Sequence, residues 1–246
     1  MELIKLGPIS INSYGLMIAV GFIAAIVMGV YRAKKKGFDP NPIYDIAMWS
    51  IGGGLVGAKI LYFITEFDQI LADPSFLWRS LTSGFVLYGG IIGGVLAAYI
   101  YCRVRKLNFL DHFDLLIPSV ALAQGLGRIG CFFAGCCYGR EADHFFSLMD
   151  HGVRRIPTQL ISSAGDFLIA GILILIARKQ KYAGQIAQWY LLLYGVGRFI
   201  VEFWRDDARG QVGALSTSQF ISIFIVLGGL LMWYVNRRRA KKDLAE

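Results

Sequence analysis

The sequence contains 246 residues, of which 56% are hydrophobic and 17% are charged, and its formal net charge is +8. Soluble domains are usually about 45–50% apolar, so this composition argues against an ordinary soluble protein. A strongly basic soluble protein would suggest a nucleic-acid partner. Here the basic residues lie mostly at the ends of long apolar runs, so membrane topology and contact with anionic lipid explain the charge, and no nucleic-acid partner is expected.

Seven apolar runs follow one another, and each is long enough to cross the roughly 30 Å hydrocarbon core of a bilayer as a helix. The runs lie at about Tyr14–Tyr31, Ile43–Ile64, Gly84–Cys102, His112–Cys137, Gln159–Ala177, Gln185–Trp204 and Ser218–Val235. They predict an all-α integral membrane protein with seven transmembrane helices, in which residues 1–246 form a single transmembrane domain. The N-terminal segment lacks the basic start and the small-residue cleavage site of a secretory signal, so we expect the first run to stay in the membrane.

Short basic clusters follow alternate runs, and this alternation predicts the orientation of the chain. The clusters comprise Arg32, Lys34, Lys35 and Lys36 after the first run, Arg103, Arg105 and Lys106 after the third, Arg178, Lys179 and Lys181 after the fifth, and Arg237, Arg238, Arg239, Lys241 and Lys242 after the seventh. Because loops rich in Lys and Arg are retained on the cytoplasmic side, we expect the N-terminus outside and the C-terminus in the cytoplasm.

Three basic residues fall inside the apolar runs or at their edges, namely Lys59, Arg128 and Arg198, and Glu202 follows Arg198 by four residues. A charge at the bilayer centre costs at least about 2.5–3.5 kcal/mol on insertion scales, so such residues usually face a partner or a cavity. Arg198 and Glu202 share a helix face and can form an ion pair. Arg128 and Arg198 together are suited to hold a phosphate through forked hydrogen bonds. Lys59 either adds to that anion site or extends toward the outer interface.

Three of the four cysteines, Cys131, Cys136 and Cys137, lie close together in the fourth run. The sequence has no C-x-x-C motif with a matching partner pair, so it predicts neither a zinc site nor another cofactor. Cys131 and Cys136 are interpreted either as small apolar fillers or, because Arg128 is near, as nucleophiles that carry a covalent intermediate.

The segment Gly127–Arg140 reads GRIGCFFAGCCYGR and resembles the signature of the prolipoprotein diacylglyceryl transferase family, which is close to GRxGNFxNxExxG. Four further segments match in the family's order: SYGLM at Ser13–Met17, YGGIIGG at Tyr88–Gly94, PTQL at Pro157–Leu160 and YGVGRFIVEFWR at Tyr194–Arg205. Five matches in register over almost the whole chain, on a pattern of seven helices with the same orientation, make the resemblance specific.

The resemblance implies an enzyme of the bacterial cytoplasmic (inner) membrane that needs no cofactor. Such an enzyme moves a diacylglyceryl group from phosphatidylglycerol, or another anionic phospholipid, to the lipobox cysteine thiol of a prolipoprotein, and glycerol-1-phosphate leaves. The reaction needs a thiolate as nucleophile, electrostatic stabilisation of the leaving phosphate and a base.

The same resemblance implies roles for individual residues. Arg128 and Arg198 match the arginines that act on the phosphate, and Glu202 would orient Arg198. Tyr14, Gly139 and Tyr194 match other functional positions and are candidates for substrate binding.

Several positions depart from the family pattern. An asparagine and the glutamate of the signature are Cys131 and Cys136 here, a second asparagine is Ala134, a histidine of the third run is Tyr88, and an arginine of the second run is Lys59. Tyr88 is kept as a candidate catalytic residue, although a tyrosine with its ordinary pKa of about 10 is a poor base at neutral pH. Lys59 and Cys131 are kept as candidate substrate-binding residues.

The departures leave alternatives open. The chain could be a divergent homologue with a different acceptor, a non-catalytic lipid-binding or lipid-moving protein on the same scaffold, or a thiol-redox membrane protein that uses the cysteines. In the leading interpretation, we expect the outer loop 138–156 to recognise the acceptor through its charged residues Glu141, Asp143, Arg154 and Arg155.

Overall fold

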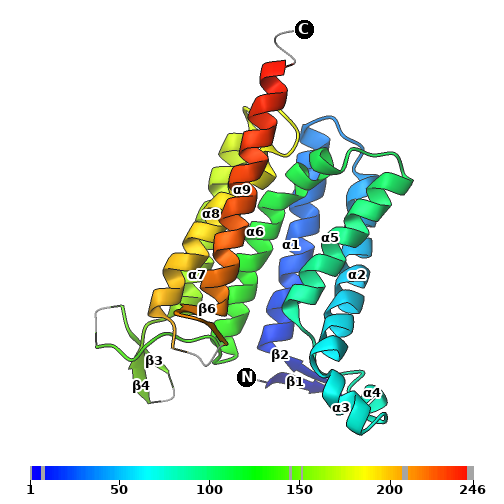
Figure 1. Cartoon of the computed structure of the whole chain (residues 1–246). Helices are drawn as coiled ribbons and strands as arrows, with labels where there is room; N and C mark the ends of the chain where they lie inside the picture. Colours follow the sequence, from blue (N-terminus) through cyan, green and yellow to red (C-terminus); the bar gives the residue numbers. More distant parts are fainter. Residues whose placement is uncertain (1, 7–8, 144–145, 151, 207–209, 243–246) are drawn as a thin grey trace. The chain divides into compact units, whose positions relative to one another are not determined.

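The computed structural model describes residues 2–6, 9–143, 146–150, 152–206 and 210–242 (Figure 1). The chain divides into two compact units, and each is described by itself. The first unit joins Met1–Gly29 to Phe113–Glu246, and the second is Val30–His112.

Within the described residues, helices dominate both units, and each of the seven expected apolar runs coincides with a long helix. The long helices are α1 (Ser13–Lys35), α2 (Asn41–Thr65), α5 (Leu87–Val104), α6 (Phe109–Phe133), α7 (Thr158–Ala177), α8 (Gln185–Val201) and α9 (Thr217–Lys242). The short ones are α3 (Phe67–Ala72), α4 (Phe76–Arg79) and the 3₁₀ turn η1 (Glu202–Trp204). The fourth run was expected to extend to Cys137, but α6 ends at Phe133 because Gly135 and Cys137 both adopt positive φ angles.

The described residues of the first unit also form three antiparallel hairpins. They pair β1 (Glu2–Leu6) with β2 (Ile9–Asn12), β3 (Leu148–Asp150) with β4 (Val153–Arg155), and β5 (Gln211–Val212) with β6 (Leu215–Ser216). Each hairpin lies immediately before a long helix, so the hairpins determine how the chain enters α1, α7 and α9.

The core of the first unit lies where α6, α7 and α8 meet. It consists of small and branched apolar residues: Ile117, Ala121, Ile169, Ala170, Leu173, Ala177, Ile186 and Ala187. The buried carboxylate of Asp114 accepts hydrogen bonds from the backbone N–H groups of Gly184 (2.7 Å) and Ala187 (2.8 Å) at the start of α8. A carboxylate at this position satisfies free N–H groups and the positive end of the helix dipole, so it ties α8 to α6.

In the second unit, α2 and α5 pack backbone against backbone through glycines. A Cβ atom added to Gly57 would lie 2.4 Å from the Gly89 carbonyl oxygen, and one added to Gly93 would lie 2.3 Å from the Gly53 oxygen. A larger side chain cannot fit without a shift of the backbone, which is the close contact that small residues permit between membrane helices.

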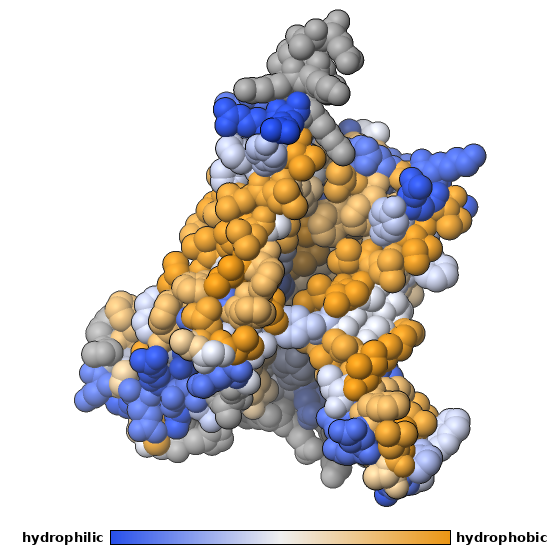
Figure 2. Space-filling view, viewed as in Figure 1, coloured by the Kyte–Doolittle hydropathy of each residue, from blue (hydrophilic) through white to orange (hydrophobic). Residues whose placement is uncertain are grey.

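In the part of the chain that the structure describes, six helices are long and apolar enough to cross a membrane, and all the long helices except α8 belong to this set. Large apolar side chains remain exposed along them; on α9 these include Phe224, Leu227 and Leu231. Figure 2 shows apolar residues covering the visible face of α9 and hydrophilic residues at its C-terminal end. Such a surface is unusual for a soluble protein and is typical of contact with lipid, so the chain is a multi-pass membrane protein.

Helix α8 has 17 residues, which span about 26 Å at about 1.5 Å per residue and fall short of the roughly 30 Å hydrocarbon core. The turn η1 directly continues it. A seventh span, the orientation of the termini and the single transmembrane domain therefore stay predictions.

Candidate functional site

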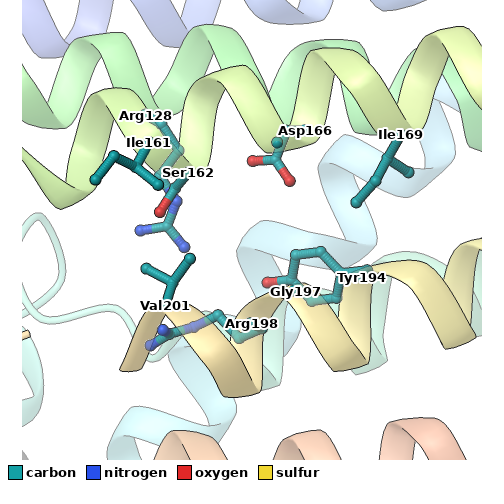
Figure 3. Close-up of a pocket in the computed structure, with 10 residues that line it drawn as sticks. Arg128, Ile161, Ser162, Asp166, Ile169, Tyr194, Gly197, Arg198 and Val201 are labelled. Carbon is teal, nitrogen blue, oxygen red and sulfur yellow. The ribbon is translucent and has the colours of Figure 1, made fainter. Parts of the chain in front are cut away.

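A pocket in the first unit lies between α6, α7 and α8, and each helix contributes polar side chains to its wall (Figure 3). The polar lining residues are Arg128, Ser162, Asp166, Tyr194 and Arg198. The cavity measures about 50 Å³, which is room for a few water molecules or a small polar group rather than a whole lipid. Figure 3 shows the Arg128 guanidinium extending from α6 toward α8, the helix that carries Arg198. The structure thus brings both arginines and Tyr194 into one cavity.

Arg198 is held in the pocket wall by partners on two elements. Its Nη1 atom lies 2.6 Å from Oε2 of Glu202, one helical turn further on, and its Nη2 atom donates to the Ser218 hydroxyl of α9 at 2.8 Å. The Nε atom of Arg205 lies 3.9 Å from the same Glu202 oxygen. Glu202 is buried, so one carboxylate balances two guanidinium groups away from water.

Ser216, the last residue of β6 and the residue directly before α9, positions Glu202 in turn. The Ser216 hydroxyl donates to Oε1 of Glu202 at 2.8 Å. The same hydroxyl accepts a hydrogen bond from the Gln219 N–H, and the Gln219 side chain accepts one from the Ser216 N–H, both at 3.2 Å. This reciprocal pair is a capping box, which satisfies two free donors at the start of a helix. The pattern Ser216-x-x-Gln219 is visible in the sequence, but its link to Arg198 is not.

Asp166 is a pocket residue to which sequence reasoning assigned no role. It is buried in α7 and is the one carboxylate among the described residues that line the pocket. It shares the pocket wall with the two guanidinium groups, so in its ionised form it would offset part of their charge. The available signal was an acidic residue inside an apolar run, which by default marks a functional position in a membrane protein.

Gly139 lies where three segments of the chain come together. Its N–H donates to the Ile156 carbonyl at 3.1 Å, and it forms a β-bridge with Arg205. A Cβ atom added here would lie 2.6 Å from the Ile156 oxygen and 2.7 Å from the Trp204 oxygen. This crowding gives Gly139 a packing role that joins the segment after α6 to the segment after α8; its substrate-binding role stays a prediction.

Tyr14 and the three clustered cysteines lie near the end of α6. The ring of Tyr14 packs on Gly130, where an added Cβ would lie 3.4 Å from a ring carbon. The Sγ atoms of Cys131, Cys136 and Cys137 all lie within 4.8 Å of one another. A hydrogen bond from the Cys131 thiol and the adjacent Arg205 guanidinium lower the pKa of the Cys137 thiol, whereas burial raises the pKa of the Cys136 thiol.

Lys59 and Tyr88 belong to the second unit, unlike the other predicted site residues. The Lys59 ammonium donates to the carbonyl oxygens of Ser80 (2.5 Å), Ser83 (2.6 Å) and Gly84 (3.0 Å). These bonds use all three donors of the group, so Lys59 holds the loop that precedes α5. Tyr88 lies in the first turn of α5 and is exposed. A substrate-binding role for Lys59 and a catalytic role for Tyr88 stay predictions.

The predicted acceptor loop 138–156 contains the hairpin β3–β4, and its residues 144–145 and 151 lie outside the described residues. Arg154 pairs with Asp143, and Nη2 of Arg155 lies 3.1 Å from Oε1 of Glu141. A second cavity of about 70 Å³ lies beside the hairpin and is lined by apolar residues together with Tyr138, Arg155 and Gln159.

Comparison with known proteins agrees with the sequence signature. The family model described as prolipoprotein diacylglyceryl transferase matches residues 1–235. Relatives named phosphatidylglycerol–prolipoprotein diacylglyceryl transferase come from Clostridium perfringens (42% identical over 97% of this chain and 96% of that protein), Clostridium tetani (43% over 96% and 98%) and Finegoldia magna (36% over 91% and 90%). The similarity extends from the N-terminal hairpin to α9 and confirms the resemblance inferred from the motifs. The chain therefore belongs to the prolipoprotein diacylglyceryl transferase family.

Proposed function

We propose that this chain transfers a diacylglyceryl group from phosphatidylglycerol to the lipobox cysteine thiol of a prolipoprotein, with release of glycerol-1-phosphate. The names of relatives that match over nearly their full length support this reaction. The observation that carries the proposal in the structure is that Arg128 and Arg198, from different helices, line one pocket.

The chemistry is a substitution at the glycerol carbon that bears the phosphate. The sulfur of the acceptor forms a bond to this carbon, the bond from the carbon to the phosphate oxygen breaks, and its electron pair leaves with glycerol phosphate. The thiol must lose its proton because the thiolate is the nucleophile. Two guanidinium groups aimed at the leaving phosphate stabilise the charge that develops there, which is often the largest single contribution to catalysis.

The remaining residues of the site support this arrangement. Glu202 orients Arg198 and is itself oriented by Ser216. Tyr194 lines the pocket and offers a hydroxyl to the headgroup. Asp166 is a carboxylate within the pocket, so it competes with Tyr88 for the role of proton acceptor, and a carboxylate is the better base at neutral pH because a tyrosine ordinarily keeps its proton up to about pH 10.

We further infer a single transmembrane domain of seven spans in the bacterial cytoplasmic (inner) membrane, with the N-terminus outside. The basic residues after α1, α5, α7 and α9 support the orientation, since positively charged loops stay in the cytoplasm. In this orientation loop 138–156 lies outside, where a prolipoprotein peptide can reach the cavity beside β3–β4. Reporter fusions made after Arg238 and after Asp73 test the topology: only the former should report a cytoplasmic location.

A transfer assay tests the proposed reaction directly. Purified protein is mixed with vesicles whose phosphatidylglycerol is labelled in the headgroup glycerol, together with a peptide that contains a lipobox cysteine. Released glycerol phosphate and a peptide that gains the mass of diacylglyceryl support the transferase. A peptide with serine in place of cysteine is the control. Binding of lipid without release of glycerol phosphate would instead identify a lipid-binding protein on the same fold.

A further inference from the structure

The turn after α6 brings three thiols together although they are spread over seven residues of sequence. Cys131 lies in the last turn of α6, and the chain then folds back, so that the Cys136 N–H donates to the Cys131 carbonyl at 3.2 Å. Gly135 and Cys137 make this reversal through positive φ angles of 66°. A positive φ costs a cysteine conformational energy, which the surrounding contacts must offset. As a result, all three Sγ atoms lie within 4.8 Å of one another.

The first residues of α7 hold this turn in place. The Thr158 hydroxyl donates to the Cys137 carbonyl at 2.9 Å, and the Gln159 amide donates to the Cys136 carbonyl at 2.8 Å. Both α7 residues are buried. Backbone anchors of this kind orient side chains that act as ligands, in the way that groups behind a metal site do. The thiol cluster is therefore a fixed arrangement and not a chance encounter of flexible side chains.

The spacing of the thiols suits a metal ion. A zinc ion about 2.3 Å from each of three sulfurs separates those sulfurs by about 3.8–4.0 Å. Sulfurs that are already within 4.8 Å of one another reach this geometry by small side-chain rotations. Thiolates select soft metals, and d¹⁰ ions accept three sulfur ligands without a demanding geometry.

The charges around the cluster suit a thiolate-bound metal. Three thiolates around a divalent ion leave a net negative charge. The positive charge of the Arg205 guanidinium interacts electrostatically with Cys136 and Cys137, and that of Arg128 interacts with Cys131. These two cations compensate the excess charge of the loaded cluster, which would otherwise be costly to hold in a partly buried position.

We propose that Cys131, Cys136 and Cys137 bind one thiophilic d¹⁰ metal ion of the Zn²⁺ class and leave its fourth position open for the thiol of the acceptor. The second half of this proposal rests on the proposed function. A zinc site with three protein ligands keeps a position for water or substrate, and a thiol that coordinates zinc loses its proton. The acceptor sulfur would thus arrive as a thiolate, with its proton passed through water to the base of the site, for which Asp166 is the candidate. It then forms the bond to carbon while the phosphate departs toward Arg128 and Arg198.

A disulfide accounts for the cluster less well. Cys136 and Cys137 are adjacent, and their Cα atoms are about 3.8 Å apart, which is shorter than the separation of about 4.4–6.8 Å that disulfides prefer. A disulfide from Cys131 to Cys136 or to Cys137 would not explain why a third thiol lies in the same cluster. A metal ion uses all three.

Metal binding is tested on the purified full-length protein, without substrate and under reducing conditions. The protein is depleted of metal and titrated with Zn²⁺, and bound zinc is measured by elemental mass spectrometry. Co²⁺ in place of Zn²⁺ reports sulfur ligands through thiolate-to-cobalt charge-transfer absorption. We expect one ion per chain. Single changes of Cys131, Cys136 or Cys137 to Ala should each weaken binding at least about 100-fold, since even partners behind the ligands contribute about 10- to 100-fold.

Cys102→Ala is the matched control because Cys102 is a buried cysteine of α5 outside the cluster, and it should bind zinc like the unaltered protein. A measurement on the unaltered chain guards against variants that fail to fold: bound Zn²⁺ should protect three thiols from alkylation. Absence of bound zinc, unchanged binding in the three variants, or a disulfide in place of protection would each overturn the metal site.

The open position is tested by adding the lipobox peptide to the Co²⁺-loaded protein. We expect the charge-transfer absorption to increase with the cysteine peptide and not with its serine counterpart. If the Zn²⁺-loaded protein transfers diacylglyceryl but the cobalt spectrum does not change, the role of the fourth position is wrong while the proposed function stands. If metal binds but no transfer occurs, the proposed function fails while the metal site stands.

Discussion

Glu202→Gln removes one negative charge from the network that holds Arg198 and leaves the shape of the side chain intact. In the folded protein the Glu202 carboxylate lies 2.6 Å from Arg198 and 3.9 Å from Arg205. The side chains of the Arg198–Glu202 pair are only 10% and 5% exposed. Breaking a buried pair by removing one partner costs about 3–5 kcal/mol, because the other charge stays buried without compensation. We therefore expect the free energy of unfolding to fall by about that amount, and two guanidinium groups to repel each other.

The same change should also reduce activity. Ser218 still holds one side of Arg198 at 2.8 Å, so the guanidinium is displaced rather than lost. A misplacement of about 1 Å commonly costs about 100-fold in rate, and we expect the transfer rate to fall roughly 10- to 100-fold. The measurements are denaturant unfolding in mixed micelles and the transfer assay with labelled phosphatidylglycerol.

A double variant separates stability from catalysis. Arg198→Met combined with Glu202→Gln no longer buries the Arg198 guanidinium without its carboxylate partner, although the buried Arg205 still lacks the Glu202 carboxylate. Removal of both members of a buried ion pair is often much less destabilising than removal of one. We expect the double variant to regain part of the stability that Glu202→Gln loses, while the transfer activity stays low because the Arg198 guanidinium is gone. If Glu202→Gln keeps stability within about 0.5 kcal/mol, the range of ordinary surface changes, and also keeps full activity, then the carboxylate does not position Arg198.

Three further changes test other parts of the structure. Arg128→Lys keeps the charge but loses the planar fork, so we expect the transfer rate to fall about 100- to 1,000-fold, as when a single stabilising donor is removed, with unaltered folding by circular dichroism. Gly57→Ala places a Cβ 2.4 Å from the Gly89 oxygen and should lower the unfolding temperature, whereas Gly52→Ala on the same helix meets nothing within 4 Å and should not. In metal-free protein, alkylation of Cys137 should continue below the ordinary thiol pKa of about 8.5 and decline only as the pH falls through its lowered pKa. Cys136 has a raised pKa and should be alkylated only at higher pH. Mass spectrometry of the labelled peptides measures both reactions, and the reverse order would contradict the assignment.

That Arg128 and Arg198 share a pocket could be anticipated from the sequence, because burying a charge is costly and each arginine lies in or at the edge of an apolar run. The ion pair of Arg198 with Glu202 could also be anticipated from their spacing of four residues, and the structure confirms it, but the serine partners of these two side chains could not. Ser216 and Ser218 reach Glu202 and Arg198 because β6 and the first turn of α9 lie beside the end of α8, and such contacts over 14 to 20 residues leave no periodic signal in the chain. The three-thiol cluster is a similar case, because its geometry depends on a reversal of the chain at Gly135 and Cys137.

The sequence by itself determined the class of this protein and its family. The class follows because apolar runs of this length are removed from water by crossing a lipid bilayer. The family follows because the motif segments and their order are read directly from the sequence, without knowledge of the fold. Only the tertiary structure decided which polar side chains meet. Asp166 lines the pocket that contains Arg128 and Arg198, and Lys59 donates its hydrogen bonds to the loop before α5. The physical reason is that a hydrogen bond or an ion pair depends on distances of about 3–4 Å between atoms, and those distances are determined by helix packing and not by spacing along the chain.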